Sequence, residues 1–287
     1  MYSTDYTTSE LMAVCAARQI RNDDIAIIGV GIPLIAGVLA NRTHAPDAIL
    51  IYEGGGIGAR SRRIPWSIAE NPTTDNAIAA APMWKVLSDC QRGLITLGIT
   101  GGAEIDRFGN LNSSVIPGEN GSYSYPKVRL PGSGGANDIA SSAQRTVTMI
   151  RLEKGKFVEK VSYITSPGYL SGPGAREKEG LKGGGPYMVI TDHCIFKFHS
   201  QTKEMYLDSL FPGITVEQVT KAVGWELQVS KQLSEVEPPT EEEIKIMRTF
   251  DSTGTILGRK SAGQKGESFE EFYEKMKAAY QDMPLDL

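Results

Sequence analysis

The chain of 287 residues has few of the features that mark disulfide-rich or metal-binding proteins. Its three cysteines, Cys15, Cys90 and Cys194, lie far apart, which predicts reduced thiols in a cytoplasmic protein and no disulfide framework. The sequence contains no CxxC motif, no HExxH motif and no cluster of Cys and His. We therefore predict no metal site, and we expect Cys194, which precedes an apolar segment, to be a core residue and not a nucleophile.

Long apolar runs and an excess of positive charge are also missing. The longest apolar stretch, residues 25–40, is shorter than the about 20 residues that cross a bilayer, and Gly29, Gly31 and Pro33 interrupt it. The N-terminus lacks the basic and then apolar pattern of a signal peptide. The net charge is −4, which argues against a nucleic-acid surface. We expect a soluble cytoplasmic protein that binds neither membranes nor nucleic acid.

The order of apolar segments and turns predicts an α/β protein. An apolar strand at 24–31, which ends in glycines, and a second at 48–53 flank a helical segment at 33–42, which is the pattern of a βαβ unit with parallel strands. Closely spaced strands late in the chain leave little room for helices and favour antiparallel pairing. We predict an open, mostly parallel sheet with helices on both faces and a late antiparallel or mixed section.

The remaining expected elements follow from the same patterns. The predicted helices are 8–20, 75–89, 137–143, 215–227, 240–250 and 269–279, and the predicted strands are 93–99, 127–130, 145–152, 157–164, 187–192, 194–199 and 204–210. No linker divides residues 1–250, so we predict one domain there. The polar residues 251–287 are expected to form a tail with one short helix.

Glycine-rich turns provide the candidate sites. Gly29 and Gly31 separate a predicted strand from a helix, where backbone amides can face an anion. This turn lacks the third glycine of GxGxxG, and the sequence also lacks a GxxxxGK[ST] phosphate loop and a GxSxG motif. A tight turn without a ligand therefore remains the alternative for this segment.

A stronger candidate is the carboxylate at the end of a predicted buried strand. Glu53 follows that strand directly and precedes Gly54, Gly55 and Gly56. The carboxyl ends of strands in open α/β sheets face the ligand crevice, so Glu53 is predicted to lie where a reacting group lies. The glycines would leave room for a bulky substrate. The alternative is a glutamate that braces a turn through backbone N–H groups.

Two further segments offer donors for an oxyanion. Gly134 and Gly135 lie between a predicted strand and helix, where successive amides can stabilise negative charge, and Asp138 would cap or brace the following helix. Asn110 and Asn112 alternate, so their side-chain amides are expected on one face. A plain turn with a capping Asp is the alternative for the glycine segment.

Three motifs in this order resemble class I coenzyme A transferases. They are Tyr-Glu-Gly-Gly at 52–55, Asp-Arg-Phe-Gly-Asn-Leu-Asn at 106–112 and Gly-Ser-Gly-Gly-Ala-Asn-Asp at 132–138. The similarity is greatest to the beta subunit of glutaconate CoA-transferase and covers about residues 8–250. Glu104 departs from the family pattern, which often has Gln there.

The resemblance implies a ping-pong transfer of CoA from an acyl-CoA to a carboxylic acid. Glu53 would be the nucleophile and would pass through a glutamyl anhydride and a glutamyl-CoA thioester. Gly134 or Gly135, with Asn110 or Asn112, would stabilise the oxyanion. Gly29, Gly31, Gly54, Gly55, Gly56 and Asp138 are the predicted substrate-binding positions. CoA thioester enters as a substrate, and no tightly bound cofactor is expected.

The resemblance also implies a partner. Such enzymes pair alpha and beta chains, so we expect an alpha subunit in an (αβ)2 or (αβ)4 assembly. A hydrolase or C–C bond-cleaving enzyme acting on a CoA thioester is the alternative, because a carboxylate can also activate water. A third hypothesis is a nucleotide-binding module without chemistry, built on the Gly29–Pro33 turn.

Overall fold

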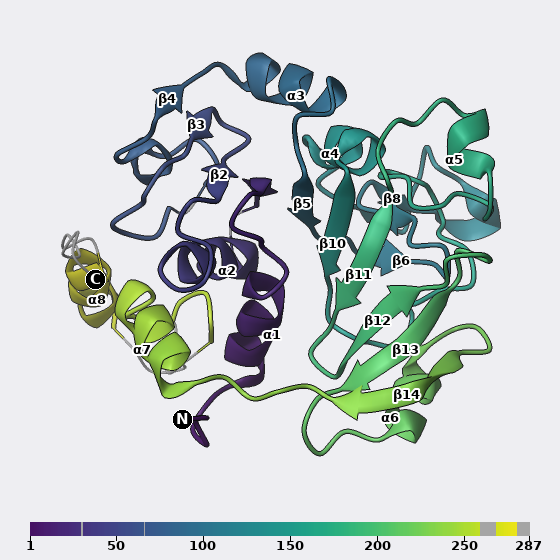
Figure 1. Ribbon diagram of the computed structural model, residues 1–287. Coiled ribbons are helices and arrows are strands. Elements are labelled where there is room, and N and C mark those ends of the chain that lie inside the picture. Colours follow the sequence, from purple (N-terminus) through teal and green to yellow (C-terminus); the bar gives the residue numbers. More distant parts are fainter. Residues whose placement is uncertain (30, 66, 259–267, 280–287) are drawn as a thin grey trace. The chain divides into compact units, whose positions relative to one another are not determined.

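The computed structural model describes residues 1–29, 31–65, 67–258 and 268–279 (Figure 1). The first compact unit comprises Met1–Val86 and Glu237–Leu287, and the second comprises Leu87–Val236. The predicted division into residues 1–250 and 251–287 stays a prediction, because compactness does not show which segments fold independently. None of the described helices is long and apolar enough to span a bilayer.

The first unit combines short strands with helices. Its strands are β1 (Ile25–Ile28), β2 (Ile49–Ile51), β3 (Gly56–Ile57) and β4 (Ala79–Ala80), and its helical segments are α1 (Thr8–Ala17), α2 (Ile32–Asn41), η1 (Asn71–Thr74), α7 (Glu241–Phe250) and α8 (Phe269–Ala279). β1 and β2 are parallel, whereas β2–β3 and β3–β4 are antiparallel. The predicted βαβ arrangement of β1, α2 and β2 is thus confirmed.

The second unit holds the late strands. Its elements are β5 (Leu97–Thr100), β6 (Glu104–Ile105), β7 (Leu111–Asn112), β8 (Val115–Ile116), η2 (Glu119–Gly121), β9 (Val128–Arg129), α4 (Ala136–Ser142), β10 (Arg145–Met149), α5 (Ala175–Lys178), β11 (Pro186–Ile190), β12 (Cys194–Phe198), β13 (Met205–Leu210), α6 (Val216–Ala222) and β14 (Gln228–Glu235). α3 (Met83–Gln91) crosses the boundary between the units.

Parallel pairing comes first and antiparallel pairing follows in this second unit. β5, β10 and β11 are parallel, and β11–β12 and β12–β13 are antiparallel. Side chains from these strands form a core around the fully buried rings of Phe157 and Phe196, whose centroids are 5.5 Å apart. The predicted α/β class with a late antiparallel section is confirmed.

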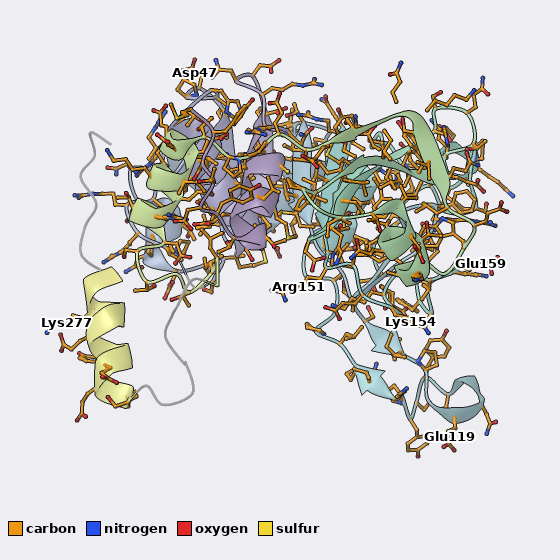
Figure 2. All side chains as sticks on the ribbon, turned by 90° about the horizontal axis from the view of Figure 1, so that it is seen from below. Asp47, Glu119, Arg151, Lys154, Glu159 and Lys277 are labelled. Atoms are coloured by element: carbon orange, nitrogen blue, oxygen red, sulfur yellow. The ribbon has the colours of Figure 1, made fainter. Side chains whose placement is uncertain are left out.

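The strands β8 and β9 form a projecting arm beside this core, with Glu119 near the end of the arm (Figure 2).

The helix predicted over 75–89 is wrong in its first half. Helix α3 begins only at Met83, directly after Pro82, which favours the first turn of a helix. Upstream, Ala79 and Ala80 pair with Ile57 and Gly56 instead. The pairing with a strand far away in the sequence overrides the local preference of the alanines for a helix.

Two other predicted elements are also wrong. Residues 157–164 form no strand, since only Phe157 makes isolated bridges, to Ile105 and Val223. The helix predicted over 215–227 ends at Ala222, and the edge strand β14 follows. Gly224 explains the break, because its amide donates to the Phe157 carbonyl and a Cβ at Gly224 would come within 2.8 Å of that oxygen.

The start of the predicted tail is packed. The Asp251 carboxylate accepts hydrogen bonds from the backbone amides of Thr255, Ile256 and Leu257. Leu257 is buried, and burial raises the pKa of Asp251 despite these donors. Residues 251–258 are therefore part of the folded first unit.

A buried ion pair ties the C-terminal part of the first unit to its N-terminal helix. Glu10 is completely buried and closes a capping box with Thr7 at the start of α1. The Arg248 guanidinium on α7 donates from Nε to Glu10 Oε1 over 2.9 Å. The pair connects residues that are 238 positions apart in the chain.

We predict that Arg248→Met lowers the free energy of unfolding by about 2–3 kcal/mol, because the buried Glu10 carboxylate loses its cation. Urea denaturation measures the effect. Arg92→Met is the control, since Arg92 pairs with Asp89 on the surface with 65% of its side chain exposed. That variant should change stability by less than about 0.5 kcal/mol. Equal losses of stability in the two variants would contradict a stabilising role of the Arg248–Glu10 ion pair.

Candidate functional site

Glu53 lies two residues beyond the end of β2 in the first unit and is partly buried. The residue before it, Tyr52, is fully buried, and its hydroxyl lies 3.3 Å from Ser61 Oγ. Ser61 Oγ in turn donates to the Pro72 carbonyl over 2.6 Å. Burial raises the pKa of Tyr52 to about 12, so this phenol stays neutral. The backbone that leads into Glu53 is therefore anchored.

The three glycines after Glu53 are packed against the chain's own backbone. A Cβ at Gly54, Gly55 or Gly56 would lie within 2.1 Å of the carbonyl oxygens of Ile68, Ala81 and Thr73, in that order. Gly55 also has φ +121°, which side chains with a Cβ rarely adopt. Their small size lets residues 68–81 lie against the loop. The role of these glycines in substrate binding stays a prediction.

The turn with Gly29 and Gly31 precedes α2, as predicted. Gly31 is the N-cap with φ +88°, and Pro33 stands in the first turn of the helix. No side chain caps this end. Val30, between the two glycines, lies outside the described residues, and anion binding here stays a prediction.

In the second unit, Asn110 is buried and uses its whole amide group within the protein. Its Nδ2 donates to Asp106 Oδ2 and to the Leu170 carbonyl, both over 2.9 Å. Its Oδ1 accepts from the amides of Gly168 at 2.8 Å and Leu170 at 3.1 Å. Leu170 has φ +57°, a conformation rare for a leucine. Asn110 thus holds a strained loop in place.

Asp106 supports this turn through a further set of hydrogen bonds. Its carboxylate also accepts from the backbone amides of Phe108 and Asn110, both over 3.0 Å. Burial raises the pKa of Asp106 from its ordinary value, and these hydrogen bonds oppose the rise. The Asp-Arg-Phe-Gly-Asn segment is therefore a hydrogen-bonded scaffold.

Asn112 is equally buried and equally engaged. Its Nδ2 donates to Glu104 Oε2 over 2.7 Å and to the Val115 carbonyl over 2.9 Å, and Glu104 faces it across the β6–β7 pair. The oxyanion role of Asn110 and Asn112 stays a prediction, and it would require these side chains to break existing hydrogen bonds. Sequence reasoning missed Glu104 as the partner, although its departure from the family pattern was visible.

The motif at 132–138 lies next to the end of the motif at 106–112. The Gly132 amide donates to the Ser113 carbonyl over 2.7 Å, next to Asn112 in the chain. Gly134 is exposed with φ +51°, and Gly135 is the N-cap of α4. The oxyanion role of these two glycines stays a prediction.

Asp138 lies inside the first turn of α4 rather than at its cap. Its Oδ1 accepts from Gln91 Nε2 on α3 over 2.8 Å. It thus braces one helix against another, and its substrate-binding role also stays a prediction.

A pocket of about 1000 Å³ opens beside the scaffold of the second motif. Phe108, Ile164 and Leu170 supply its apolar wall. Its charged lining is mixed and consists of Arg107, Lys160 and Lys178 with Asp106, Glu159 and Glu179. The Arg107 guanidinium carbon lies 5.2 Å from the centroid of the Phe108 ring. The strained Leu170 held by Asn110 therefore shapes the wall of a cavity large enough for an organic substrate.

Metal and thiol chemistry have little support in the described part of the chain. No group of three or more His, Cys, Asp or Glu residues there could hold a metal ion. Cys15, Cys90 and Cys194 are all free and buried, and burial raises the pKa of their thiols to about 12, 11 and 12. Buried thiols with raised pKa values do not fit the role of a nucleophile, and the predicted core position of Cys194 is confirmed.

A model of the family described as coenzyme A transferase matches residues 9–222. The chain belongs to the coenzyme A transferase family. It is 38% identical over 261 residues to the B subunit of 3-oxoadipate CoA-transferase from Pseudomonas knackmussii, covering 91% of this chain and 99% of that protein. It is also 38% identical over 251 residues to the B subunit of glutaconate CoA-transferase from Acidaminococcus fermentans, covering 85% and 92%.

The structure agrees with these matches. The crystal structure of glutaconate coenzyme A-transferase from Acidaminococcus fermentans superposes with a TM-score of 0.82 at 35% identity, covering 90% of this chain and 99% of that one. The predicted family resemblance is confirmed, and the chain is a CoA-transferase that corresponds to the B subunits of these relatives.

For the scaffold, we predict that Asn110→Ala lowers the free energy of unfolding by about 2–4 kcal/mol, because buried amides at Gly168 and Leu170 lose their acceptor. Asn22→Ala removes two exposed hydrogen bonds, one donated to the Asp47 carboxylate and one accepted from the Asp47 amide, and should cost less than about 0.5 kcal/mol. Similar losses of stability in both variants would contradict the role of Asn110 in holding the loop at Gly168 and Leu170.

The loss in Asn110→Ala should also depend on pH. Without the Asn110 donor, the raised pKa of Asp106 rises further in the folded state. A folded pKa above the unfolded value means that the folded state binds the proton more tightly, so the destabilisation should shrink as pH falls through that folded pKa. Denaturation at pH 5 and pH 8 measures this difference.

For the cysteines, we predict that an aromatic disulfide reagent labels none of the three thiols of the native protein at pH 8. Their raised pKa values keep the thiolate fraction negligible, and burial blocks access. All three should react rapidly in denaturant. Fast labelling of one thiol under native conditions would contradict the structural role of that residue.

Proposed function

We propose that this chain transfers CoA through a covalent intermediate on Glu53. The support is the 38% identity to the B subunits of two CoA-transferases over nearly the whole chain, together with a carboxylate at the end of an anchored strand. A carboxylate suits this role because its anhydride and its thioester both keep the transferred group activated.

The proposed chemistry proceeds in balanced exchanges. A Glu53 carboxylate oxygen attacks the thioester carbonyl, the C–S bond breaks, and CoA thiolate leaves a mixed anhydride. The thiolate then attacks the glutamyl carbonyl and expels the first acid as its carboxylate. The acceptor carboxylate repeats both exchanges on the glutamyl-CoA thioester in reverse. No net proton is gained or lost.

Exclusion of water is the physical requirement of this sequence, since hydrolysis would discharge either intermediate. The packed glycine loop is consistent with that requirement, because backbone carbonyls fill the space beside Gly54, Gly55 and Gly56. We propose that the partner chain completes the enclosure. Both relatives are named as one subunit of an enzyme, which supports an alpha-type partner. An (αβ)2 or (αβ)4 assembly is part of the same proposal.

The names of the two relatives contain 3-oxoadipate and glutaconate, which are both dicarboxylic acids. We therefore propose a dicarboxylic acid, or its CoA ester, as one substrate. A soluble cytoplasmic location is part of the same proposal, because three free cysteines fit a reducing compartment.

We expect Glu53→Gln to lower the transfer rate of the assembled enzyme by at least about 10³-fold, as loss of a nucleophile does elsewhere. Glu119→Gln, at the exposed end of the β8–β9 arm (Figure 2), should leave the rate unchanged. The assay follows acyl-CoA exchange with each dicarboxylic acid by chromatography.

A trapping experiment tests the intermediate itself. Incubation with acyl-CoA and then hydroxylamine should convert Glu53 to its hydroxamate, detectable by peptide mass spectrometry in the native enzyme and in Glu119→Gln. An unmodified Glu53 in an active complex would refute the covalent route. Turnover without an acceptor acid, with oxygen from labelled water in the product, would identify a hydrolase instead.

A further inference from the structure

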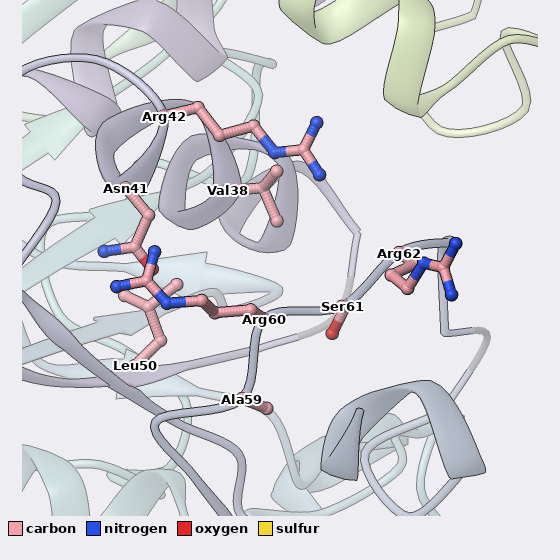
Figure 3. Close-up of a pocket in the computed structure, with 8 residues that line it drawn as sticks. All are labelled: Val38, Asn41, Arg42, Leu50, Ala59, Arg60, Ser61 and Arg62. Carbon is pink, nitrogen blue, oxygen red and sulfur yellow. The ribbon is translucent and has the colours of Figure 1, made fainter. Parts of the chain in front are cut away.

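A second pocket, of about 140 Å³, lies wholly within the first unit (Figure 3). Its lining residues come from the end of α2, from β2 and from the segment after β3, and are Val38, Asn41, Arg42, Leu50, Ala59, Arg60, Ser61 and Arg62. Three of them are arginines and none carries a carboxylate.

Arg42 is the central observation. The residue is partly buried, and its guanidinium forms no ion pair with any carboxylate in the described part of the chain. The guanidinium carbon lies 5.9 Å from the centroid of the Phe250 ring. Burial lowers the pKa of Arg42 from its ordinary value. A partly buried cation without an anion beside it is unfavourable, and an anion in the pocket would remove that cost.

The polar groups around Arg42 are already fixed in place. Asn41 Nδ2 donates to the carbonyls of Ala45 and Ala48 over 2.9 and 3.0 Å. Arg60 Nη2 donates to the Pro46 carbonyl over 2.8 Å, which uses one of the five N–H donors of its guanidinium. Asn41 and Arg60 are thus held in place around Arg42 by their hydrogen bonds to backbone carbonyls.

The pocket lies away from Glu53 along the same strand. The Gly58 amide donates to the Leu50 carbonyl, so the segment that leads to Arg60 runs back beside β2. Asn41 and Arg60 hold the backbone that precedes β2, whereas Glu53 follows it. Glu53 is not among the residues that line this pocket.

We propose that this pocket binds a phosphate group. Guanidinium groups recognise phosphate through paired N–H donors, and several arginines can share the oxygens of one phosphate, which they cannot do as fully with one carboxylate. The pocket, at about 140 Å³, is smaller than the roughly 300–1,000 Å³ of sites that enclose a drug-sized ligand. That space suits one phosphate group and excludes a whole acyl-CoA.

Two sources supply this chemistry. The phosphate can be free inorganic phosphate, or it can be the 3′-phosphate of a CoA ester whose remainder lies outside the pocket. The second source rests on the proposed function and the first does not. The pocket itself requires only the phosphate.

The test is titration calorimetry of the full-length chain with inorganic phosphate at low ionic strength, where charge interactions are least screened. Native protein should show one saturable site. Arg42→Gln should weaken binding by about tenfold or more, because charge-assisted hydrogen bonds are lost. Arg42→Lys should lose less, since it keeps the charge.

Arg151→Gln is the matched control, an exposed arginine of the second unit (Figure 2). Its phosphate affinity should equal that of the native chain. Arg60→Gln serves if Arg42→Gln fails to fold, because the Arg60 side chain is exposed and should still weaken binding. Absence of saturable binding, or equal affinities in the Arg42, Arg60 and Arg151 variants, would overturn the proposal.

Competition identifies the source. If CoA displaces phosphate and dephospho-CoA does not, the pocket receives the 3′-phosphate of CoA. If neither compound displaces it, free phosphate is the ligand. Either of these two outcomes supports a phosphate site in the pocket. Glu53→Gln should bind phosphate as the native chain does, so failure of the covalent mechanism would leave this measurement unaffected.

Discussion

The loop after β2 leaves no room for a side chain at three consecutive positions. Carbonyl oxygens of Ile68, Thr73 and Ala81 occupy the space where Cβ atoms at Gly54, Gly55 and Gly56 would lie. This contact brings residues 68–81 against the end of β2 and accompanies the pairing of β3 with β4. The position of Glu53 therefore depends on backbone packing that only glycine permits. Backbone fills the space beside the glycines on that side of the loop, and their role in substrate binding stays a prediction.

In the second unit, buried side-chain amides hold the loop conformation. Asn110 and Asn112 saturate backbone groups that loops would otherwise leave unpaired, and Asp106 and Glu104 complete the two networks. Unsatisfied buried amides are costly, so such residues specify one loop conformation. A motif that resembles part of a catalytic apparatus thus acts as a scaffold in this structure, and it shapes a large pocket through Leu170.

Local signals succeeded where a segment's own pattern decides its structure. The apolar run of β1 and the proline of α2 each act within a few residues, and those elements form as predicted. The helix predicted over 8–20 also forms, but it ends at Ala17. Local signals failed where a distant partner decides. Ala79 and Ala80 pair with β3, and Gly224 meets the Phe157 carbonyl, so the helices predicted there begin late or end early.

The sequence by itself determined the α/β class, the family, and the glutamate that follows β2, because strand periodicity, ordered motifs and residue chemistry are local and additive. Tertiary structure alone decided that the two asparagines are fully hydrogen-bonded and that Arg42, Arg60 and Arg62 line one pocket. Those facts depend on contacts between segments such as Asn110 with Leu170, 60 residues apart, and Arg42 with Phe250. Sequence spacing carries no record of such contacts, since they arise only when the chain packs.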